Sequence, residues 1–478
     1  MPIISHDDMQ LLATTIQGVL RLEKIDLVIH AEERVLQEGF HKVFSTLPPS
    51  IRKCKLLGVH LRPHIPFGFD EDPRDFEQSD DNVESDLESE DGERSNHSVN
   101  DSESQGHESV QEINQEYDPT VDNDQYLVPE VVFRDDPLHL LKKFVCWGDY
   151  TLTNEGILAV LDHCPFVEHL RMPPVAAVGS ELDSLAVLIN MKCPLLHSIE
   201  SPLNSEGPLL LTVMDAMPSQ QLKKFEVSAS TPIFDDGAAR RAFGRHSSTL
   251  HKIDLRYASV RSMDLLVILE LCESLEILIQ HSNYGTSSIT LANAISVPWA
   301  CKKIRRLEIT IGLAKVSSQD PYYRRTVPVV LSTEERRQFA DLEMFYRQIG
   351  SLVQLEYLDM CGTYLNDEGQ SYLLRMNGCT FPAMLSLQDD ATGRPRYLNL
   401  LAGLINLKEL RGSVRVATDE AQMTVGEREM DWIGTHWLAL RRATLFASNN
   451  DVRESFKRLH DILRPELSLV LYGDGMGS

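Results

Sequence analysis

One spacing pattern, apolar-x-x-apolar-x-apolar, recurs along this 478-residue chain and constrains its fold more than any single residue does. Between Leu141 and Ile304, successive copies begin 26, 29, 26, 28, 25 and 29 residues apart. A repeat of this length holds one strand and one helix, and such a unit buries its apolar face only by stacking on its neighbours. Twelve copies are present, and they begin at Leu22, Ile51, Leu141, Val167, Leu196, Leu222, Leu250, Leu275, Ile304, Leu355, Leu407 and Leu440.

Each copy predicts a short strand followed by a helix. At Ile253, Asp254 and Leu255, apolar and charged residues alternate with the two-residue period of a strand, and residues 262–272 that follow are apolar enough for a buried helix. Strands that recur with helices between them form a parallel sheet. The predicted fold class is therefore α/β, a solenoid with a curved parallel sheet on its inside and helices on its outside. A further helix is expected at residues 11–20.

Four of the eight cysteines occupy the same position of the repeat, three residues before its first apolar residue. A structural metal site needs clustered ligands, and no close Cys-x-x-Cys pair is present in the sequence. A small apolar side chain packed at the corner between helix and strand explains the position better. Scattered thiols of this kind favour a reducing compartment, so we expect a cytoplasmic or nuclear protein. The four are Cys164, Cys193, Cys272 and Cys301.

The units that carry these cysteines resemble a known repeat family. Cys272-Glu-Ser-Leu275-Glu-Ile-Leu278 and Cys164-Pro-Phe-Val167-Glu-His-Leu170-Arg-Met172 look like the core of the cysteine-containing leucine-rich repeats common in F-box proteins. The irregular spacing and long insertions are most similar to the F-box-type proteins of fungi, and the resemblance extends from about Leu11 to the C-terminus, one acidic insertion excepted. It implies a leucine-rich-repeat solenoid that recognises substrates for a ubiquitin ligase. No F-box is recognisable ahead of the repeats.

The acidity of the chain is concentrated in one segment. The net charge is −25, and residues 70–124 hold 21 acidic side chains against two basic ones, a local charge of −19. Few large apolar residues are present there, so burial does not offset the entropy of ordering, and we predict a disordered acidic insertion at 69–127. It separates the first repeat units, at 1–68, from the main array at 128–478. Three serines in it precede an acidic residue by three positions, as in acid-directed kinase sites, namely Ser85, Ser98 and Ser109.

Two gaps between copies, of 51 residues after Ile304 and 52 after Leu355, are about twice the usual step. They predict long insertions near 313–340 and 375–398, with a helix at 332–349. Insertions in repeat arrays often help to form the binding face. The first contains Pro321-Tyr322-Tyr323-Arg324-Arg325, a partner-contact candidate because Tyr and Arg are enriched in binding hot spots, although an ordinary surface loop is favoured. Its two arginines are also the candidates for a GTPase-activating role.

The residues between the apolar strand positions are expected to face away from the core, onto the inner surface of the sheet. The third repeat position is basic in seven of twelve copies, and the fifth is acidic in six. Parallel strands lie about 4.8 Å apart, so these side chains form adjoining rows that either neutralise each other, which is favoured, or form a charged groove for a partner. The basic residues are Lys24, Lys53, Lys143, Lys224, Lys252, Arg306 and Arg442, and the acidic ones are Asp26, Glu200, Glu226, Asp254, Glu308 and Asp359.

Near Leu275 the register has two solutions. If the copy begins at Leu275, as the cysteine three residues earlier supports, Ile277 and Ile279 form an exposed apolar patch on the inner surface. A slip of one residue buries both isoleucines and removes Gln280 from the core. The sequence favours neither solution.

The function that these patterns favour is a non-enzymatic scaffold for protein–protein interaction, and the resemblance implies the substrate-recognition subunit of a ubiquitin ligase. The alternative is a regulator or chaperone whose acidic insertion binds basic proteins such as histones, although a solvated spacer is the favoured interpretation of that insertion. No phosphate-binding Gly-Lys-Ser/Thr loop, His-Glu-x-x-His or Gly-x-Ser-x-Gly motif is present, so we expect no catalytic, cofactor or metal site. No apolar run is long enough for a membrane span, and near neutrality outside the insertion disfavours nucleic acid. The partner-binding candidates are Lys224, Glu226, Lys252, Asp254, Arg256, Ile277, Ile279, Arg306, Glu308, Tyr322, Tyr323 and Tyr357.

Overall fold

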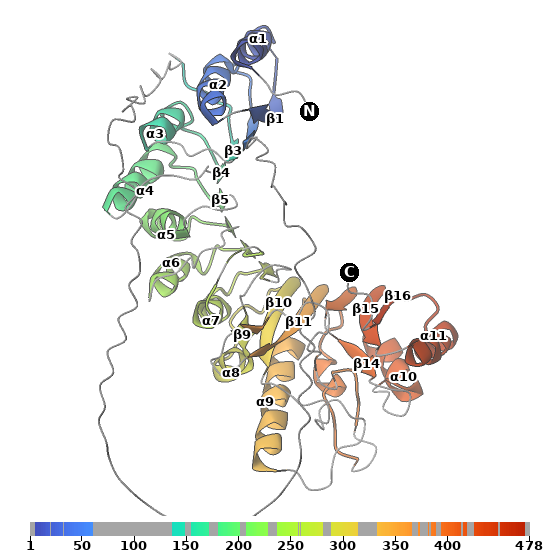
Figure 1. Ribbon diagram of the computed structural model, residues 1–478. Helices are drawn as coiled ribbons and strands as arrows, with labels where there is room; N and C mark the ends of the chain where they lie inside the picture. The colour runs from blue at the N-terminus through green and yellow to red at the C-terminus, as the bar shows by residue number, and fades with distance from the viewer. Residues whose placement is uncertain are drawn as a thin grey trace, which may run out of the picture. The chain divides into compact units, whose positions relative to one another are not determined.

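The computed structural model shows an α/β array in which parallel strands line one side and helices the other (Figure 1). It describes residues 5–19, 21–31, 33–60, 136–148, 154–171, 180–200, 207–227, 237–256, 258, 260–280, 288–313, 332–365, 371–372, 381, 384–388, 393–412, 414–417, 425–447 and 450–473. The described residues within Met1–Leu61 and Val131–Ser478 form one compact unit. The acidic insertion predicted at 69–127 lies outside the described residues.

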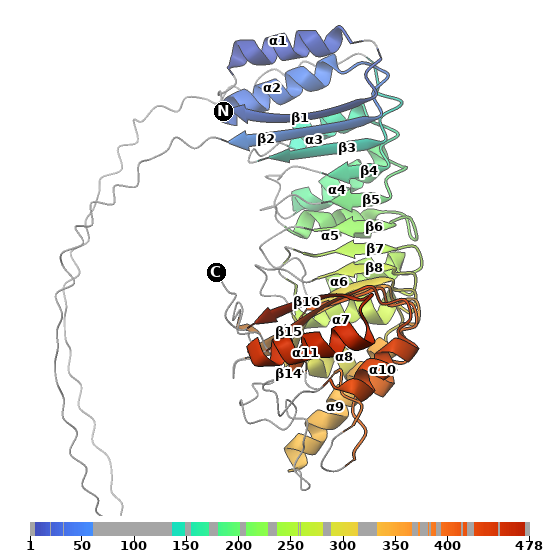
Figure 2. The same cartoon turned by 90° about the vertical axis from the view of Figure 1, so that its right-hand side faces the viewer.

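Sixteen strands of the described chain form one sheet, and within it only β11 and β12 pair antiparallel. Figure 2 shows β1 to β8 of this sheet side by side. The strands are β1 (Lys24–Ala31), β2 (Lys53–His60), β3 (Lys143–Gly148), β4 (His169–Arg171), β5 (Ser198–Glu200), β6 (Lys224–Glu226), β7 (Lys252–Asp254), β8 (Ile277–Ile279), β9 (Ile289–Thr290), β10 (Arg306–Leu313), β11 (Tyr357–Leu365), β12 (Ser371–Tyr372), β13 (Glu409–Gly412), β14 (Arg415–Ala417), β15 (Arg442–Ala447) and β16 (Ser468–Gly473).

Helices connect these strands. They are α1 (His6–Gln17), α2 (Glu33–Thr46), α3 (Asn154–Asp162), α4 (Ser180–Lys192), α5 (Gly207–Ala216), α6 (Ala238–His246), α7 (Ser262–Leu271), α8 (Leu291–Ser296), α9 (Thr333–Gly350), α10 (Glu427–His436) and α11 (Asn450–Leu463), with a 3-10 helix, η2, at Leu398–Leu401. The helices expected at 262–272 and 332–349 are confirmed as α7 and α9.

The helix expected at 11–20 both begins and ends earlier, as α1. The side chain of Ser5 accepts a hydrogen bond from the N–H of Asp8, and the Asp8 carboxylate accepts one from the N–H of Ser5. This capping box satisfies N–H groups that are otherwise left without partners at a helix start. It sets the first turn five residues before the apolar pattern begins.

Strand register follows the predicted repeat without a slip. The third position of every copy is the first residue of a strand, and neighbouring first residues are paired, as Lys224 is with Lys252 and Lys252 with Ile277. Four strands lie outside the twelve predicted copies, namely β9, β12, β14 and β16. Of these, β16 pairs with β15 from its first residue as the repeat strands do, with Ser468 opposite Arg442. Glu466 occupies the position that is apolar in the other copies, which hid this last unit from the pattern.

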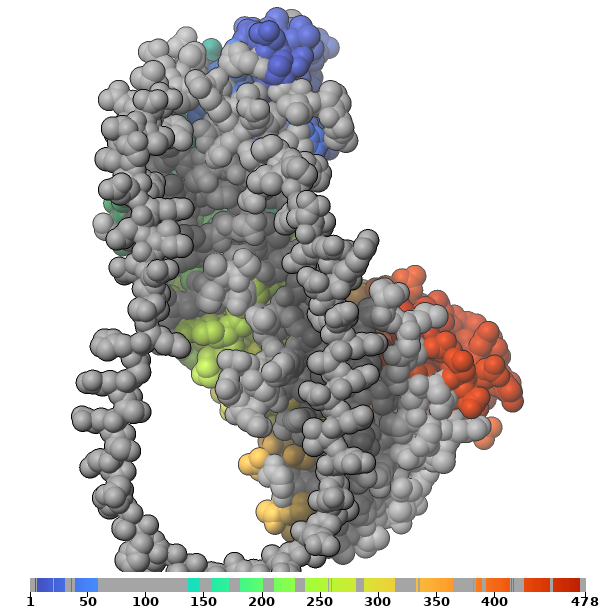
Figure 3. Space-filling view, in the orientation of Figure 1, coloured from blue at the N-terminus to red at the C-terminus, as the bar shows by residue number. Residues whose placement is uncertain are grey.

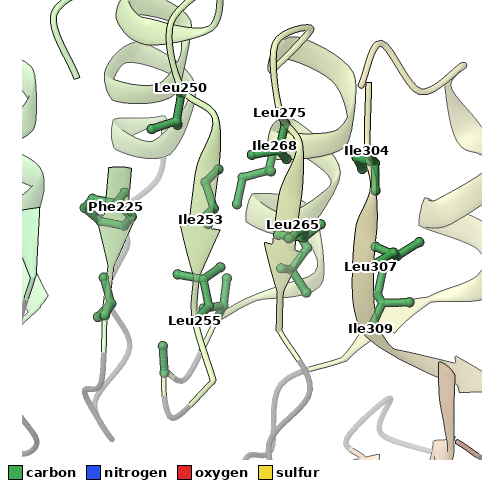
Figure 4. Packing of buried hydrophobic residues seen from close by; sticks show 14 of the residues in the cluster. Phe225, Leu250, Ile253, Leu255, Leu265, Ile268, Leu275, Ile304, Leu307 and Ile309 are labelled. Atoms are coloured by element: carbon green, nitrogen blue, oxygen red, sulfur yellow. The ribbon is translucent and has the colours of Figure 1, made fainter. Parts of the chain in front are cut away.

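The core lies between the sheet and the helices. In each copy the fourth position points inward, and Phe225, Ile253 and Leu278 are completely buried there. Figure 4 shows this layer at β6 to β10, where strand residues lie beside Leu265 and Ile268 of α7. Full burial of such a side chain contributes about 1.5–3 kcal/mol relative to exposure. Each interior unit shares its core with the units on both sides. The N-terminal units, blue, and the C-terminal units, red, therefore lie apart at the two ends of the stack (Figure 3).

The four cysteines of the repeat lie buried at the corner where helix turns into strand, as predicted. In each case the first apolar strand residue donates its N–H to the carbonyl three residues earlier, as Leu275 does to Cys272. Along the row, the thiol of Cys193 lies 3.8 Å from the carbonyl oxygen of Cys164, within hydrogen-bonding reach. Burial raises the pKa of the Cys193 and Cys301 thiols to about 12, so they stay protonated. These residues pack the corner of each turn.

Candidate functional site on the inner sheet face

Two rows of side chains face the inner surface of the sheet. The first inner row consists of the first residue of each strand, and the second inner row of the residue two positions later. The residue between them points into the core, because successive strand residues face opposite sides. This arrangement places ten of the twelve candidate residues in or directly beyond the two rows, on β6, β7, β8, β10 and β11. Tyr322 and Tyr323 lie outside the described residues, as do Arg324 and Arg325.

Charges of the two rows are largely paired between and within strands in the middle of the array. The Lys252 ammonium lies 2.5 Å from Glu226 and 3.6 Å from Asp254, and Arg256 lies 3.3 Å from the same Asp254 carboxylate. Burial raises the pKa of Asp254, and the charges of Arg256 and Lys252 only partly oppose that rise. Lys224 is exposed and forms no ion pair within the described residues. This pairing agrees with the self-neutralising alternative for the central strands.

A second polar cluster lies next to it on β4 and β5. His169 lies with Nδ1 2.5 Å from the Ser198 hydroxyl and Nε2 3.3 Å from Glu200, which also pairs with Arg171 at 2.5 Å. A serine, a histidine and a carboxylate in contact resemble a hydrolytic triad in residue types. However, Ser198 is only 1% exposed, so its hydroxyl does not face a substrate. The cluster ties two strands together.

The register near Leu275 is the first of the two predicted solutions. Leu278 faces the core, and Ile277 and Ile279 lie in the first and second inner rows. The expected exposure is wrong for Ile279, which is only 3% exposed, whereas Ile277 is half-buried. The neighbours of Ile279 in the second inner row, Asp254 and Glu308, are also poorly exposed, because long side chains on adjacent strands cover one another. The apolar contribution to the surface therefore comes from Ile277.

An aromatic ring between two arginines occupies the next part of the face. The guanidinium of Arg306 lies 4.5 Å from the ring centre of Tyr357, and that of Arg411 lies 5.6 Å from it. Each arginine is also paired with an acidic residue of its own strand, Arg306 with Glu308 and Arg411 with Glu409. Burial, reinforced by the nearby carboxylates, raises the pKa of Tyr357 to about 12, so the phenol keeps its proton. The face here combines a half-buried ring, fixed cations and hydrogen-bonding groups.

Arg411 was missed by the sequence reasoning. It stands at the fifth repeat position, where six other copies carry an acidic residue, so its charge broke the expected pattern. The signal that could have found it is the register, because Arg411 pairs with Asp359 in the sheet. Its contact with Tyr357 is diagonal, because the register pairs Tyr357 with Glu409.

No protein-family model matches this sequence, and none of the curated proteins does either. Within the described residues, no group of three or more His, Cys, Asp or Glu side chains is arranged to hold a metal ion. No described helix has the length and apolar character to cross a membrane.

A further charged row, also missed, lies at the turn before each strand, at the second repeat position. Glu356 is bonded there by Arg305 of the preceding unit and at 2.6 Å by Lys408 of the following one. Hydrogen bonds from Lys408 and Arg305 lower the pKa of Glu356. At this position the sign of the charge alternates from one copy to the next, in the order Glu276, Arg305, Glu356 and Lys408. This alternation is the sequence signal that could have revealed the row. This row links neighbouring repeats to one another and lies on the side of the sheet where the strands begin, outside the two inner rows.

Proposed function

We propose that this chain is a non-enzymatic leucine-rich-repeat scaffold that holds a protein partner on the inner sheet face between β6 and β13. The observation that supports this most is the Tyr357 ring between Arg306 and Arg411. Tyrosine and arginine are the residue types that most often dominate binding energy at protein interfaces. A ring already held between two guanidinium groups loses little conformational freedom when a partner covers it.

The surroundings of this stack favour a polypeptide as the partner. Ile277 adds an apolar contact two strands away, and Lys224 adds an exposed cation beyond it. The paired charges around Asp254 and Glu226 contribute little net potential, so they select a partner by the positions of its hydrogen bonds. A protein surface with an apolar centre and a polar rim matches this distribution.

The partner class follows from the resemblance to F-box-type repeat proteins. We propose that the bound protein is a substrate for ubiquitination and that the scaffold acts in the cytoplasm or nucleus. Copurification of the chain with a ubiquitin-ligase adaptor subunit tests this part. If no ligase component is recovered, the ligase role is rejected and the scaffold role stands alone.

Affinity capture with matched tyrosine variants tests the scaffold role. Tyr357→Ala removes the ring from the inner face, whereas Tyr472→Ala removes a ring that is 43% exposed on β16, outside the proposed surface. Quantitative mass spectrometry of captured proteins should show partners that bind the parent and Tyr472→Ala but are lost with Tyr357→Ala. Unchanged thermal unfolding of both variants is the control for folding. If both retain the same partners, the proposed surface is wrong.

A second candidate function rests on the charge of residues 70–124. A local charge of −19 favours binding of basic proteins such as histones. Deleting 70–124 should then abolish histone binding and leave the Tyr357-dependent partners in place. Histone binding that survives the deletion would rule out this candidate.

A further inference from the structure

We infer a second binding site, for an acidic polypeptide segment, on the inner face of β1, β2 and β3. Three lysines stand there in the first inner row, because Lys24 pairs with Lys53 and Lys53 pairs with Lys143 in the sheet. Parallel strands lie about 4.8 Å apart, so three ammonium groups extend from a stretch of about 10 Å. Lys55 adds a fourth cation in the second inner row.

The charge of this end is not neutralised, unlike that of the rest of the face. Across β1 to β3 the two inner rows hold four lysines and one aspartate, Asp26, a net charge of +3. From β4 to β8, and again on β10, β11, β13 and β15, the two rows carry equal numbers of Lys or Arg side chains and carboxylates.

Exposure and local shape support a ligand site at this position. Lys24, Lys53 and Lys143 are exposed, and none of them forms an ion pair within the described residues. Lys55 lies 3.3 Å from Asp26, the one acidic residue in the two inner rows of β1 to β3. The four lysines and Asp26 line a hollow of about 270 Å³ on the sheet surface. Like charges held this close repel one another, and a bound anion relieves that repulsion.

The chemistry of the neighbouring residues favours a polypeptide over a nucleic acid. Val28 lies on the same face of β1 as Lys24, is 49% exposed and pairs with Leu57 of β2. An apolar residue therefore adjoins the lysines and suits a segment that mixes acidic with apolar side chains. The positive track is also short, because Glu200 and Glu226 follow within the next strands. An extended segment of about three to four residues covers it, whereas a nucleic acid needs a longer row of cations for comparable affinity.

Fluorescence anisotropy with the full-length protein tests the site. The probe is a labelled nine-residue peptide with three Glu-Asp-Leu repeats, and its control is the same length of Gln-Asn-Leu. Binding of the acidic peptide should weaken as salt rises. Lys53→Glu, in the middle of the row, should weaken it about fivefold or more, and Lys53→Arg should retain it. Lys457→Glu, on an exposed position of α11, is the matched control and should change it less than twofold.

Two further binding measurements can contradict this site. A chain that lacks residues 70–124 removes the repulsion between that acidic stretch and the probe, so it should bind the peptide more tightly than the full chain. Failure of the acidic peptide to bind either form in a Lys53-dependent way overturns the site. So does a single-stranded oligonucleotide that binds more tightly through the same lysines. Tyr357→Ala should bind the peptide normally, which separates this site from the proposed partner surface.

Discussion

The side-chain oxygen of Gln280 accepts a hydrogen bond from the backbone N–H of Thr310 at 2.7 Å, across the β8–β10 junction. Gln280 occupies an apolar position of the repeat and is 1% exposed. A polar side chain is tolerated in a core when its hydrogen-bonding groups have partners. This bond explains how the repeat accepts a glutamine without a shift of register.

Replacing Gln280 tests that explanation. Gln280→Ala takes an acceptor away from the Thr310 N–H and opens a cavity, so it should lower the free energy of unfolding by about 1–3 kcal/mol in urea denaturation. Gln354→Ala, at an exposed position, is the control and should change it by less than about 0.5 kcal/mol. Equal effects of the two substitutions would show that the bond to Thr310 contributes nothing.

Gly412 is expected to be intolerant of any side chain. Its φ of +98° lies in the left-handed region, and a Cβ atom would lie 2.0 Å from the carbonyl oxygen of Met360. Gly412→Ala should therefore lower the melting temperature, and backbone strain alone should lower the free energy of unfolding by about 1–3 kcal/mol. Gly244→Ala in α6 meets only Leu271, at 3.9 Å, and should stabilise by about 0.5–1 kcal/mol. The opposite signs distinguish this effect from a general sensitivity of glycines.

Thiol labelling should distinguish the buried cysteine row from Cys361, which is partly exposed on β11. Only the thiolate reacts, and burial raises the pKa of Cys193 and Cys301 to about 12. In the native protein at pH 8, Cys361 should therefore react with iodoacetamide before either of them, as followed by peptide mass spectrometry. In urea the difference should vanish. Early native labelling of Cys301 would contradict its place in the core.

Glu200 and Asp254 should affect acid stability in opposite ways. Burial raises the pKa of Glu200, but the bond from His169 and the charge of Arg171 outweigh it and leave the pKa below 4.5. For Asp254 burial prevails, and its pKa lies above 3.8. When folding lowers the pKa of a carboxylate, that group stabilises the fold at pH values above its unfolded pKa. The stabilisation is lost as the pH falls through its folded pKa. A raised pKa has the opposite sign.

Unfolding in urea between pH 3 and pH 7 checks both signs. Glu200→Gln should lower the free energy of unfolding at pH 7, and the deficit should shrink as pH falls below about 4.5. Asp254→Asn should raise it at pH 7, and the gain should shrink toward pH 3.8, while the Asn oxygen keeps an acceptor for the Arg256 N–H. A loss of stability at pH 7 with Asp254→Asn would contradict the raised pKa.

Most of the fold could be predicted from the repeat. The first strand residue of every predicted copy is correct because one face of the sheet is buried, and a one-residue slip would expose every inward side chain. The cysteine row follows from the same constraint. Unit β16 could not be found, because Glu466 stands where the pattern requires an apolar residue.

The candidate surface could be predicted only as rows of residues. The sequence alone determined which side chains share a face, because strand alternation and repeat length are local properties of the chain. The tertiary structure decided that Lys252 pairs with Glu226, that Ile279 is covered, and that Arg411 lies beside Tyr357. The members of the two pairs are about 26 and 54 positions apart in the sequence, and Ile279 is covered by neighbours on other strands. Their contacts therefore depend on which long side chains meet once the repeats have stacked.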